Sequence, residues 1–479
     1  AGTVSGIIDT NTTWTLANSP YQVTGHVTVN PDVTLTIEPG VRVVFDHYMG
    51  LWVNGNLQAT GTVDLPIVFT GSTEQNGWWR GIYVQSAGSA TLVHVQVAYG
   101  GYWDGAGVWK TGAGALTLQD STLSHVAGDG LRVAAGYSNF TSTNNSFHHN
   151  SNGVRVGVNV SFDDDTSTFS DNSAHVYLDG GTITEQVTWN LNPAYSFFVS
   201  SHLTVGEAGQ LDILPGTVVK FAQYAGLWVD GRLDVSGTAI GPVYFTDWRD
   251  DTVGGDANMD GTATTPAVEW WRGFYVRNAG TAHLENATVR YAGYWDGMGI
   301  LKSGSGSLTL NDTTIQHATG DGLRVADNSG TVILENVTLA NNSSTGLRLT
   351  NAGPVTGQGC AFQNNGAYGI LQEINDSFGY TGNTFNGNGL AGVGINGGTR
   401  TTNMTLSPEG NPFRVNEHVA VGAGATLTIQ PGVRVEFAQY KGLWVDGTLS
   451  AVGSSTSLIT FTGTTETAGW WEGVQVRNA

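Results

Sequence analysis

A long internal repeat is the feature that most limits how this chain can fold, because repeated segments fold as repeated units that stack on their neighbours. The segment 35–53 opens with Leu-Thr-Ile-Glu-Pro-Gly and closes with Gly-Leu-Trp-Val, and it recurs at 211–229 and 427–445. Each copy continues to a tryptophan pair, at 78–79, 270–271 and 470–471. The sequence therefore predicts three tandem units, namely 1–179, 180–396 with an inserted acidic loop at 247–261, and an incomplete third unit at 397–479.

A shorter period lies inside these copies. Glycines that open a Gly-apolar-x-apolar pattern recur in steps of roughly two dozen residues, the size of one supersecondary unit; they are Gly107, Gly130, Gly153, Gly299, Gly322, Gly346, Gly369 and Gly392. Apolar residues alternate in short runs such as 34–37 and 332–334, and clusters of Gly, Asn, Asp and Ser separate these runs. A helical period is absent. The pattern predicts an all-β parallel β-helix, or solenoid, with coils of about 21 to 24 residues and about three short strands in each coil.

The motifs of the first copy also carry a family resemblance. The run 34–41 reads Thr-Leu-Thr-Ile-Glu-Pro-Gly-Val, and 51–57 reads Leu-x-Val-x-Gly-x-Leu. The chain resembles the right-handed parallel β-helix proteins of the pectate-lyase-like superfamily, and most of all secreted surface proteins with internal repeats. The resemblance implies a right-handed solenoid, but a fold of this kind does not specify an activity.

Composition excludes several classes of protein. With 19 Lys and Arg against 39 Asp and Glu, the formal charge is -20, which opposes binding to nucleic acids or anionic membranes. The 40% hydrophobic content requires a folded core. Apolar runs long enough to span a bilayer are absent from the sequence. Cys360 is the only cysteine, so an intramolecular disulfide and a cysteine-ligated zinc site are excluded.

Strand alternation places one residue of each Gly-apolar-x-apolar repeat on the outside, between inward residues such as Leu131 and Val133. Stacked coils align these outward residues in a column about 4.8 Å apart. The predicted column reads Trp52, Tyr83, Trp109, Arg132, Arg155 in copy one, then Trp228, Tyr275, Leu301, Arg324, Arg348, Leu371 in copy two, and Trp444, Gln475 in copy three. Aromatic rings beside arginines suit stacking on sugars, and they equally suit a ladder that satisfies itself through cation–π contacts.

Acidic residues precede several strands of this column. The Tyr-Trp-Asp-Gly and Gly-Asp-Gly segments directly precede these strands, which predicts that Trp103 and Trp295 lie on one rim with the acidic residues. The resemblance implies that an enzyme of this fold would use acidic residues and an arginine on such a rim. The candidates for such a site are Asp104, Asp129 and Arg132 in copy one, and Asp296, Asp321 and Arg324 in copy two. Two observations favour a turn instead of catalysis: the set is duplicated, and Asp-Gly is an ordinary turn signal. We therefore expect no catalytic site.

The inserted loop has the spacing of a calcium site. Asp256, Asn258 and Asp260 precede Gly261 in the pattern D-x-N-x-D-G, in which alternate side-chain oxygens converge on one ion. Asp250 and Asp251 could complete the shell. The twelfth loop position is Ala267 instead of Glu, so the sequence predicts a structural Ca²⁺ site and not a helix-loop-helix sensor.

Two weaker signals concern the surface. Asn-x-Ser/Thr sequons are candidates for glycosylation, among them Asn11, Asn139, Asn286, Asn336 and Asn403. The pair His148 and His149 has no third ligand at metal spacing, so we expect both to lie in a turn.

These features support two hypotheses about function. The first is a non-enzymatic extracellular or cell-surface β-helix protein that provides structure, either as a fragment of a longer array or as a filament whose subunits stack head-to-tail through open terminal coils. The second is a carbohydrate-binding adhesin, or a polysaccharide lyase or glycoside hydrolase, that uses the outward column. Candidate ligand-binding residues for the second are Trp52, Tyr83, Trp103, Trp109, Trp228, Tyr275, Trp295 and Trp444. Expected partners are other copies of the chain and a polysaccharide, with no nucleic acid and no membrane insertion.

Overall fold

A computed structural model describes residues 2–103 and 105–477. Short parallel strands make up nearly all of its regular structure, and the described helical segments are the two 3₁₀ turns η1 (Leu16–Asn18) and η2 (Pro408–Gly410). Neither of these helices is long or apolar enough to cross a membrane. The expected all-β class is confirmed.

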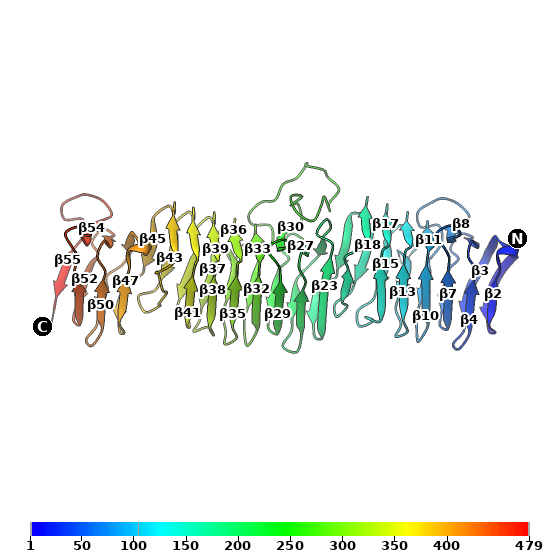
Figure 1. The fold of residues 1–479 in the computed structure, drawn as a ribbon, viewed down its shortest axis with the longest axis horizontal. Helices are drawn as coiled ribbons and strands as arrows, with labels where there is room; N and C mark the ends of the chain where they lie inside the picture. Colours follow the sequence, from blue (N-terminus) through cyan, green and yellow to red (C-terminus); the bar gives the residue numbers. More distant parts are fainter. Residues whose placement is uncertain (1, 104, 478–479) are drawn as a thin grey trace. The chain divides into compact units, whose positions relative to one another are not determined.

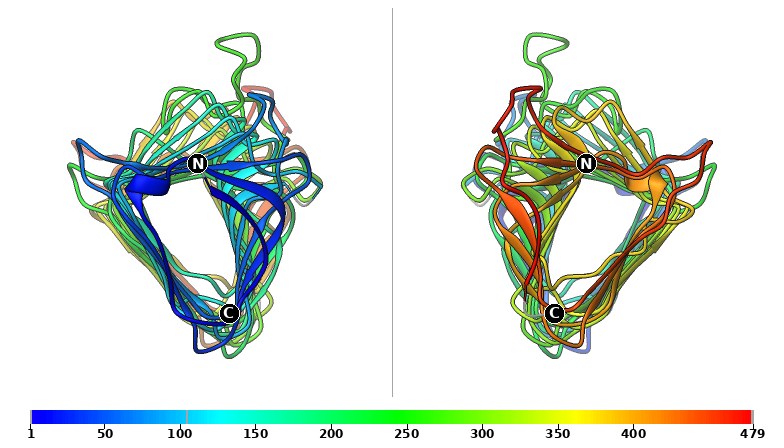
Figure 2. Two further views of the ribbon diagram at one scale, coloured as in Figure 1. Left: turned by 90° about the vertical axis from the view of Figure 1, so that its right-hand side faces the viewer. Right: turned by 90° about the vertical axis from the view of Figure 1, so that its left-hand side faces the viewer.

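Successive coils lie directly on one another. Strand β15 (Asp129–Val133) pairs in parallel with β18 (Asn152–Val156), and Arg132 is in register with Arg155, one coil later. The glycine step read from the sequence therefore equals one coil of a parallel β-helix. Seen along the coils, strands of successive coils superpose within each part of the chain (Figure 2).

The chain forms two compact units: unit 1 is Ala1–Leu203, Leu211–Ala222 and Trp248–Thr265, and unit 2 is Thr204–Gln210, Gln223–Asp247 and Pro266–Ala479. In unit 1 the strands form three faces (Figure 1). The column face holds β6 (Leu51–Val53), β9 (Ile82–Val84), β12 (Ala106–Lys110), β15, β18, β21 (Ala174–Leu178), β24 (Phe197–Val199) and β27 (Val218–Phe221). A second face holds β5 (Arg42–Phe45), β8 (Ile67–Gly71), β11 (Val95–Ala98), β14 (Thr122–Ser124), β17 (Ser146–His148) and β20 (Thr168–Ser170). The third holds β2 (Thr12–Trp14), β4 (Thr34–Ile37), β7 (Asn56–Thr60), β10 (Ser89–Val93), β13 (Leu116–Gln119) and β16 (Phe140–Thr143), then the pair β19 (Phe162–Asp164) and β23 (Gln186–Leu191). The first strands, β1 (Gly2–Ile8) and β3 (Tyr21–Val29), are long enough to bend across two faces.

Unit 2 repeats this plan. Its column face holds β28 (Leu227–Val229), β31 (Phe274–Val276), β34 (Met298–Lys302), β37 (Asp321–Ala326), β40 (Leu347–Thr350), β43 (Tyr368–Gln372), β45 (Ala391–Ile395), β48 (Phe413–Val415), β51 (Arg434–Phe437) and β54 (Thr460–Gly463). The other two faces hold β29 (Arg232–Ser236), β32 (Thr281–Glu285), β35 (Leu308–Asn311), β38 (Val332–Glu335), β41 (Val355–Gln358), and β30 (Val243–Asp247), β33 (Ala287–Arg290), β36 (Thr314–Gln316), β39 (Thr338–Ala340), β42 (Ala361–Gln363), β44 (Thr384–Asn386). Two small sheets hold β46 (Gly398–Arg400), β49 (Val419–Val421), β52 (Gly442–Val445), β55 (Gly473–Val476), and β47 (Met404–Leu406), β50 (Thr426–Ile429), β53 (Thr448–Ala451). Three short strands, β22 (Gly181–Ile183), β25 (Leu203–Val205) and β26 (Gln210–Ile213), lie near the boundary between the units in the sequence.

The inward residues predicted from the alternation form the core. Leu131, Val133, Val154 and Val156 are each at most 1% exposed, and the corresponding residues of neighbouring coils, such as Val108 and Val176, are buried as well. Burial of each such side chain contributes roughly 1.5 to 3 kcal/mol. The coils are therefore held together by a continuous apolar stack.

The column changes face where one sequence copy gives way to the next. In unit 2, Leu371 is in register with Gly394, then with Arg414 and Glu436, all on one sheet. Trp444, the column residue of the third copy, lies instead on the separate sheet of β46, β49, β52 and β55. Each copy therefore has its own column, and the columns of the second and third copies are not continuous with each other.

Candidate ligand-binding surface

The outward column exists as predicted in register. Trp52 is paired with Tyr83, Tyr83 with Trp109, and Trp109 with Arg132. In copy two, Trp228 pairs with Tyr275 and then with Leu301. The column residues therefore stand one above another on a rigid sheet.

These side chains stack on each other. The rings of Trp52 and Tyr83 have centroids 5.4 Å apart, and those of Trp228 and Tyr275 are 5.2 Å apart. The guanidinium of Arg132 lies over Trp109 at 5.0 Å, a distance typical of cation–π contact. Tyr83 is 5% exposed and Tyr275 8% exposed. Trp52, Trp109 and Trp228 are half-buried, and Trp109 Nε1 is buried without a hydrogen-bond partner among the described residues. The column is thus a stacked ladder whose tyrosines are covered and whose tryptophans keep part of their ring surface.

The third copy shows the same arrangement. The rings of Trp444 and His418 stack with centroids 4.5 Å apart, and the guanidinium of Arg477 lies over the Trp444 ring, 4.7 Å from its centroid. Trp444 is therefore also covered by neighbouring side chains.

Buried aspartates anchor the arginines of the column. Asp129 and Asp321 are each 1% exposed. Arg132 Nε lies 2.5 Å from Asp129 Oδ2, and Arg324 Nη2 lies 2.7 Å from Asp321 Oδ2. Burial, opposed by the arginine, raises the pKa of Asp129. These aspartates are already paired, which is an arrangement that holds a turn and a strand together.

Of the other two acidic candidates, Asp104 and Asp296, Asp104 lies outside the described residues. Asp296 is partly exposed and accepts a hydrogen bond from the Tyr275 hydroxyl at 2.5 Å. Burial, followed by this hydrogen bond, raises the pKa of Tyr275 strongly, so the phenol stays protonated. Asp296 therefore holds a column tyrosine at the rim of the ladder.

Trp103 and Trp295 are far more exposed to solvent than the residues of the column. They are 81% and 78% exposed, and each follows a tyrosine, Tyr102 or Tyr294, in the Tyr-Trp-Asp-Gly turn. The tyrosine in turn contacts a ring from an earlier coil: Tyr48 lies 4.4 Å from Tyr102, and Tyr224 lies 4.4 Å from Tyr294. The exposed aromatic surface therefore lies at these turns.

The inserted loop packs on unit 1. The ring centroids of Trp248 and Phe198 are 3.9 Å apart. The buried Lys220 donates a hydrogen bond from Nζ to the Gly255 carbonyl oxygen at 2.6 Å. In Figure 2 it is the green loop that projects beyond the surrounding turns. The loop thus covers the last coils of the unit 1 column, where Phe198 is in register with Lys220.

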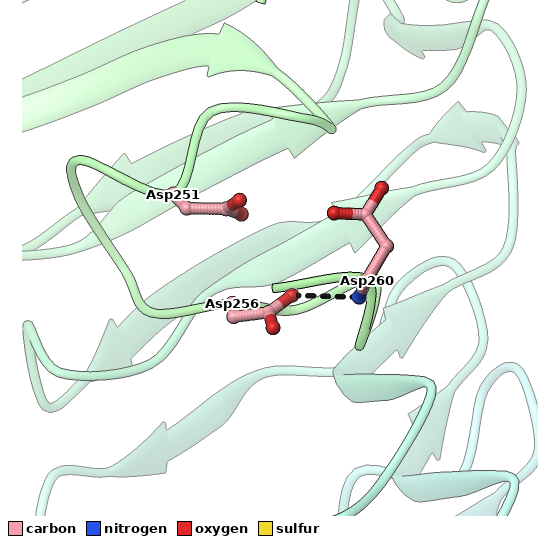
Figure 3. A group of neighbouring side chains, drawn as sticks. All are labelled: Asp251, Asp256 and Asp260. Carbon is pink, nitrogen blue, oxygen red and sulfur yellow. Dashed lines mark hydrogen bonds between the residues drawn. The ribbon is translucent and has the colours of Figure 1, made fainter. Parts of the chain in front are cut away.

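Three of the five predicted calcium ligands come together in this loop. One carboxylate oxygen from each of Asp251, Asp256 and Asp260 lies within 4.8 Å of the others (Figure 3). Asp250 is fully buried and accepts a hydrogen bond from Thr252 at 2.7 Å. Asn258 donates its amide to Asp260 at 3.0 Å. The structure therefore groups three aspartates and gives Asp250 and Asn258 partners within the loop.

The electrostatics of the cluster are unfavourable without a cation. Burial raises the pKa of Asp251, and the neighbouring Asp256 and Asp260 raise it further against the opposing charge of Lys220. Asp251 Oδ1 and Asp260 Oδ1 are buried and lack a hydrogen-bond partner among the described residues. The oxygens of the loop are thus of the kind that a hard divalent cation accepts.

The sequon asparagines lie in turns. Asn11, Asn139, Asn336 and Asn403 are exposed, and Asn286 is half-buried. Asn11 and Asn403 accept from the backbone amides of Thr34 and Thr426, each at 2.9 Å. Their glycosylation remains a prediction. His148 and His149 contact each other and His125 in a ring cluster at the surface.

Sequence reasoning missed two sets of buried polar residues. Asn342 donates its side-chain amide to Asn365 Oδ1 at 2.9 Å, and Asn365 donates in turn to Asn388 Oδ1 at 3.0 Å. Lys110 and Lys302, at equivalent positions, are fully buried and donate to turn carbonyls, with Lys302 Nζ 2.7 Å from the Ser303 oxygen. A recurrence of Asn at one-coil spacing was the available signal for the first set, whereas one Lys at the equivalent position of two copies gave none.

Two family models of β-helix domains match segments of this chain. Residues 268–462 match a family model described as a right handed beta helix region, and residues 6–102 match one described as a pectate-lyase like beta helix domain. A 76-residue segment is 38% identical to Protein bark beetle of Drosophila melanogaster; it covers 16% of this chain and only 2% of that protein. A crystal structure of a mutant periplasmic alginate epimerase aligns over 98% of this chain and 85% of its own, with 10% identity and a TM-score of 0.21. The chain is a right-handed parallel β-helix that contains a pectate-lyase-like β-helix domain.

Proposed function

We propose that this chain is a non-enzymatic structural element of an extracellular or cell-surface protein. The observation that carries the proposal is the pairing of the acidic candidates. Asp129 and Asp321 are buried and bound to arginines of their own sheet, so neither is placed to protonate, deprotonate or attack a substrate.

The scaffold also suits a mechanical role. Within each unit, an apolar stack and parallel hydrogen bonding between neighbouring coils of the described residues favour a stiff scaffold. Few Lys residues and a charge of -20 suit a surface that stays hydrated and does not bind nucleic acid.

Enzyme assays test this proposal directly. The full chain is incubated with polygalacturonate, alginate and neutral glucans, and unsaturated products, reducing ends and changes in uronate stereochemistry are measured. We expect none above a no-protein control. Turnover that is lost in Asp296→Asn but kept in the exposed control Asp64→Asn would overturn the proposal.

Self-association through strand edges belongs to the same proposal. Ile7 in β1 and Val476 in β55 are 68% and 69% exposed on strands that can pair with another chain. Sedimentation velocity is expected to show species that grow with protein concentration. A monomer at every concentration would contradict head-to-tail stacking and leave the non-enzymatic proposal standing.

A second proposal concerns the loop with Asp251, Asp256 and Asp260: it binds Ca²⁺ and is ordered by it. Support comes from the three converging carboxylates and the two buried oxygens without partners. Ca²⁺ is expected to slow proteolysis within 248–265, and EDTA to reverse the effect. Asp256→Asn with Asp260→Asn should abolish the Ca²⁺ response, whereas Asp64→Asn should keep it. An identical digestion pattern with Ca²⁺ and with EDTA would contradict this role.

A further inference from the structure

Two turns of this chain present the same group of aromatic side chains. We define platform 1 as Tyr48, Tyr102 and Trp103, and platform 2 as Tyr224, Tyr294 and Trp295. Within platform 1 the ring centroids are 4.4 Å apart between the tyrosines and 6.4 Å apart between Tyr102 and Trp103. In platform 2 the same distances are 4.4 Å and 6.3 Å. The arrangement is therefore a repeated feature and not an accident of one loop.

The backbone of each platform is held in an unfavourable conformation. Trp103 and Trp295 have φ of 63° and 74°, and Tyr48 and Tyr224 both have φ of 70°. Bulky residues rarely occupy this left-handed region, because the Cβ atom there clashes with the backbone, so each such residue destabilises the fold. Glycine would avoid the cost at every one of these positions. The chain keeps an aromatic residue there in both copies.

Packing within the fold does not account for the tryptophans. Trp103 and Trp295 are 81% and 78% exposed, and among the described residues their ring contacts are with Tyr102 and Tyr294 alone. An exposed indole at a strained position gains little from the folded state itself. Such a residue is expected where it contacts something outside the chain.

The two copies retain the platforms while the column diverges. Trp109 in the copy-one column is replaced by Leu301 in copy two, although both occupy the same register position. Over the same stretch the Tyr-Trp-Asp-Gly turn is identical. The exposed platform is thus the same in both copies, whereas the column differs at this position.

The chemistry of the platforms fits the face of a sugar ring. Aromatic rings stack on the apolar C–H faces of pyranoses, and tyrosine hydroxyls at the ring edges can form hydrogen bonds with sugar hydroxyls. The hydrogen bond with Tyr48 raises the pKa of Tyr102, and burial raises that of Tyr294, so both phenols are neutral and able to donate.

Charge favours a neutral polymer over a uronate. The whole chain carries -20, and Asp296 follows Trp295 of platform 2 in the chain. Locally, the positive charges of Arg80 at Tyr102 and Arg272 at Tyr294 oppose this negative charge, and Glu269 adds to it at Tyr294. A polyanion would be repelled by this field. A ligand of repeating units also suits a chain that presents the same platform twice.

We propose that each aromatic platform, formed by an adjacent tyrosine and tryptophan and by a tyrosine of an earlier coil, binds pyranose rings of a neutral polysaccharide. This site is separate from the buried column. It adds a ligand to the non-enzymatic role proposed above, and either proposal can fail without the other.

Calorimetric titration with a short neutral oligosaccharide, such as a cello- or laminari-hexaose chosen from a glycan array, tests the proposal by stoichiometry. The wild-type chain should bind about two molecules. Trp103→Ala and Trp295→Ala should each bind one, and the double variant should bind none or at least tenfold more weakly. Circular dichroism and the melting temperature of each variant establish that it is folded.

Ile240→Ala is the matched control, because Ile240 is fully exposed and lies outside both platforms. Its stoichiometry and affinity should equal the wild type. Binding that survives in the double variant, preference for polygalacturonate over every neutral glycan, or no binding across the neutral glycans would each overturn the proposal. So would tryptophan-dependent self-association in sedimentation velocity, since the platforms would then be protein contacts.

Discussion

The same six residues, Gly-Asp-Gly-Leu-Arg-Val, build different charge networks in the two units. In unit 1, Asp129 binds Arg132 through Oδ2 and accepts from Asn152 Nδ2 through Oδ1 at 2.7 Å. The next arginine of the column, Arg155, forms an ion pair with Asp179, with Arg155 Nη2 2.7 Å from Asp179 Oδ1. In unit 1 each arginine therefore has its own carboxylate.

In unit 2 a single carboxylate holds two arginines. Asp321 Oδ2 lies 2.7 Å from Arg324 Nη2 and 2.6 Å from Arg348 Nε. Thr345 stands where unit 1 has Asn152, and its side chain cannot reach the aspartate with an amide donor. The difference shows that the following coil, not the repeated motif, decides how a buried aspartate is used.

Loss of the shared carboxylate should have the largest effect. Asp321→Asn leaves two half-buried guanidiniums without their counter-ion, which should lower the free energy of unfolding by roughly 2 to 4 kcal/mol, the loss being reduced by their contact with water. Urea unfolding measures the total, and hydrogen exchange in β37 and β40 shows whether the loss is local. Asp327→Asn, at an exposed aspartate nearby, removes the same charge and should change neither. An equal loss in Asp129→Asn would remove the distinction between the units.

Conversion of unit 1 to the pattern of unit 2 should cost less. Asn152→Thr removes a hydrogen bond to a carboxylate, worth about 1.5 to 3 kcal/mol, and part of it should be regained when Arg155 moves to Asp129. A double-mutant cycle between Asp129 and Arg155 should show a larger coupling energy in the Asn152→Thr background than in the wild type. Unchanged coupling would show that something other than Asn152 directs Arg155 to Asp179.

The sequence was sufficient for the fold because the coil period and the alternation are local patterns that one buried stack satisfies. The register of Trp52 with Tyr83, and the inward direction of Leu131, followed from the period alone. The partners of the arginines could not be predicted from the period, because they depend on which side chain of the next coil bonds the buried carboxylate.

The candidate sites were predictable to different degrees. The D-x-N-x-D-G spacing brought Asp256 and Asp260 together, but it gave no sign that Asp250 would be buried with its own partner. Trp103 and Trp295 were among the candidate ligand-binding residues. The sequence did not indicate the contribution of Tyr48, because this residue lies two coils earlier in the chain and contacts Tyr102 only through the stacking of coils.

The pH dependence of Asp129 offers a finer comparison. Burial raises the pKa of Asp129 in the folded state above its unfolded value. Between these two pKa values the folded chain binds more protons than the unfolded chain, so the free energy of unfolding falls as the pH rises through that range. Asp129→Asn lacks this titration, so the stability of the variant relative to wild type should increase from pH 3 upward. Urea unfolding at a series of pH values measures the difference. A variant that becomes relatively less stable as pH rises would show that the arginine outweighs burial.

The smallest effect is expected at the separate pair of unit 1. Arg155 and Asp179 are 35% and 39% exposed, so water and salt screen their interaction, and Asp179→Asn should cost less than about 1 kcal/mol. That cost should shrink further in 1 M NaCl, whereas the cost of Asp321→Asn should persist because its carboxylate is buried. Comparison of the two variants at low and high salt thus separates a screened surface pair from a buried anchor, and equal salt sensitivity would mean that the two units hold their arginines in the same way after all.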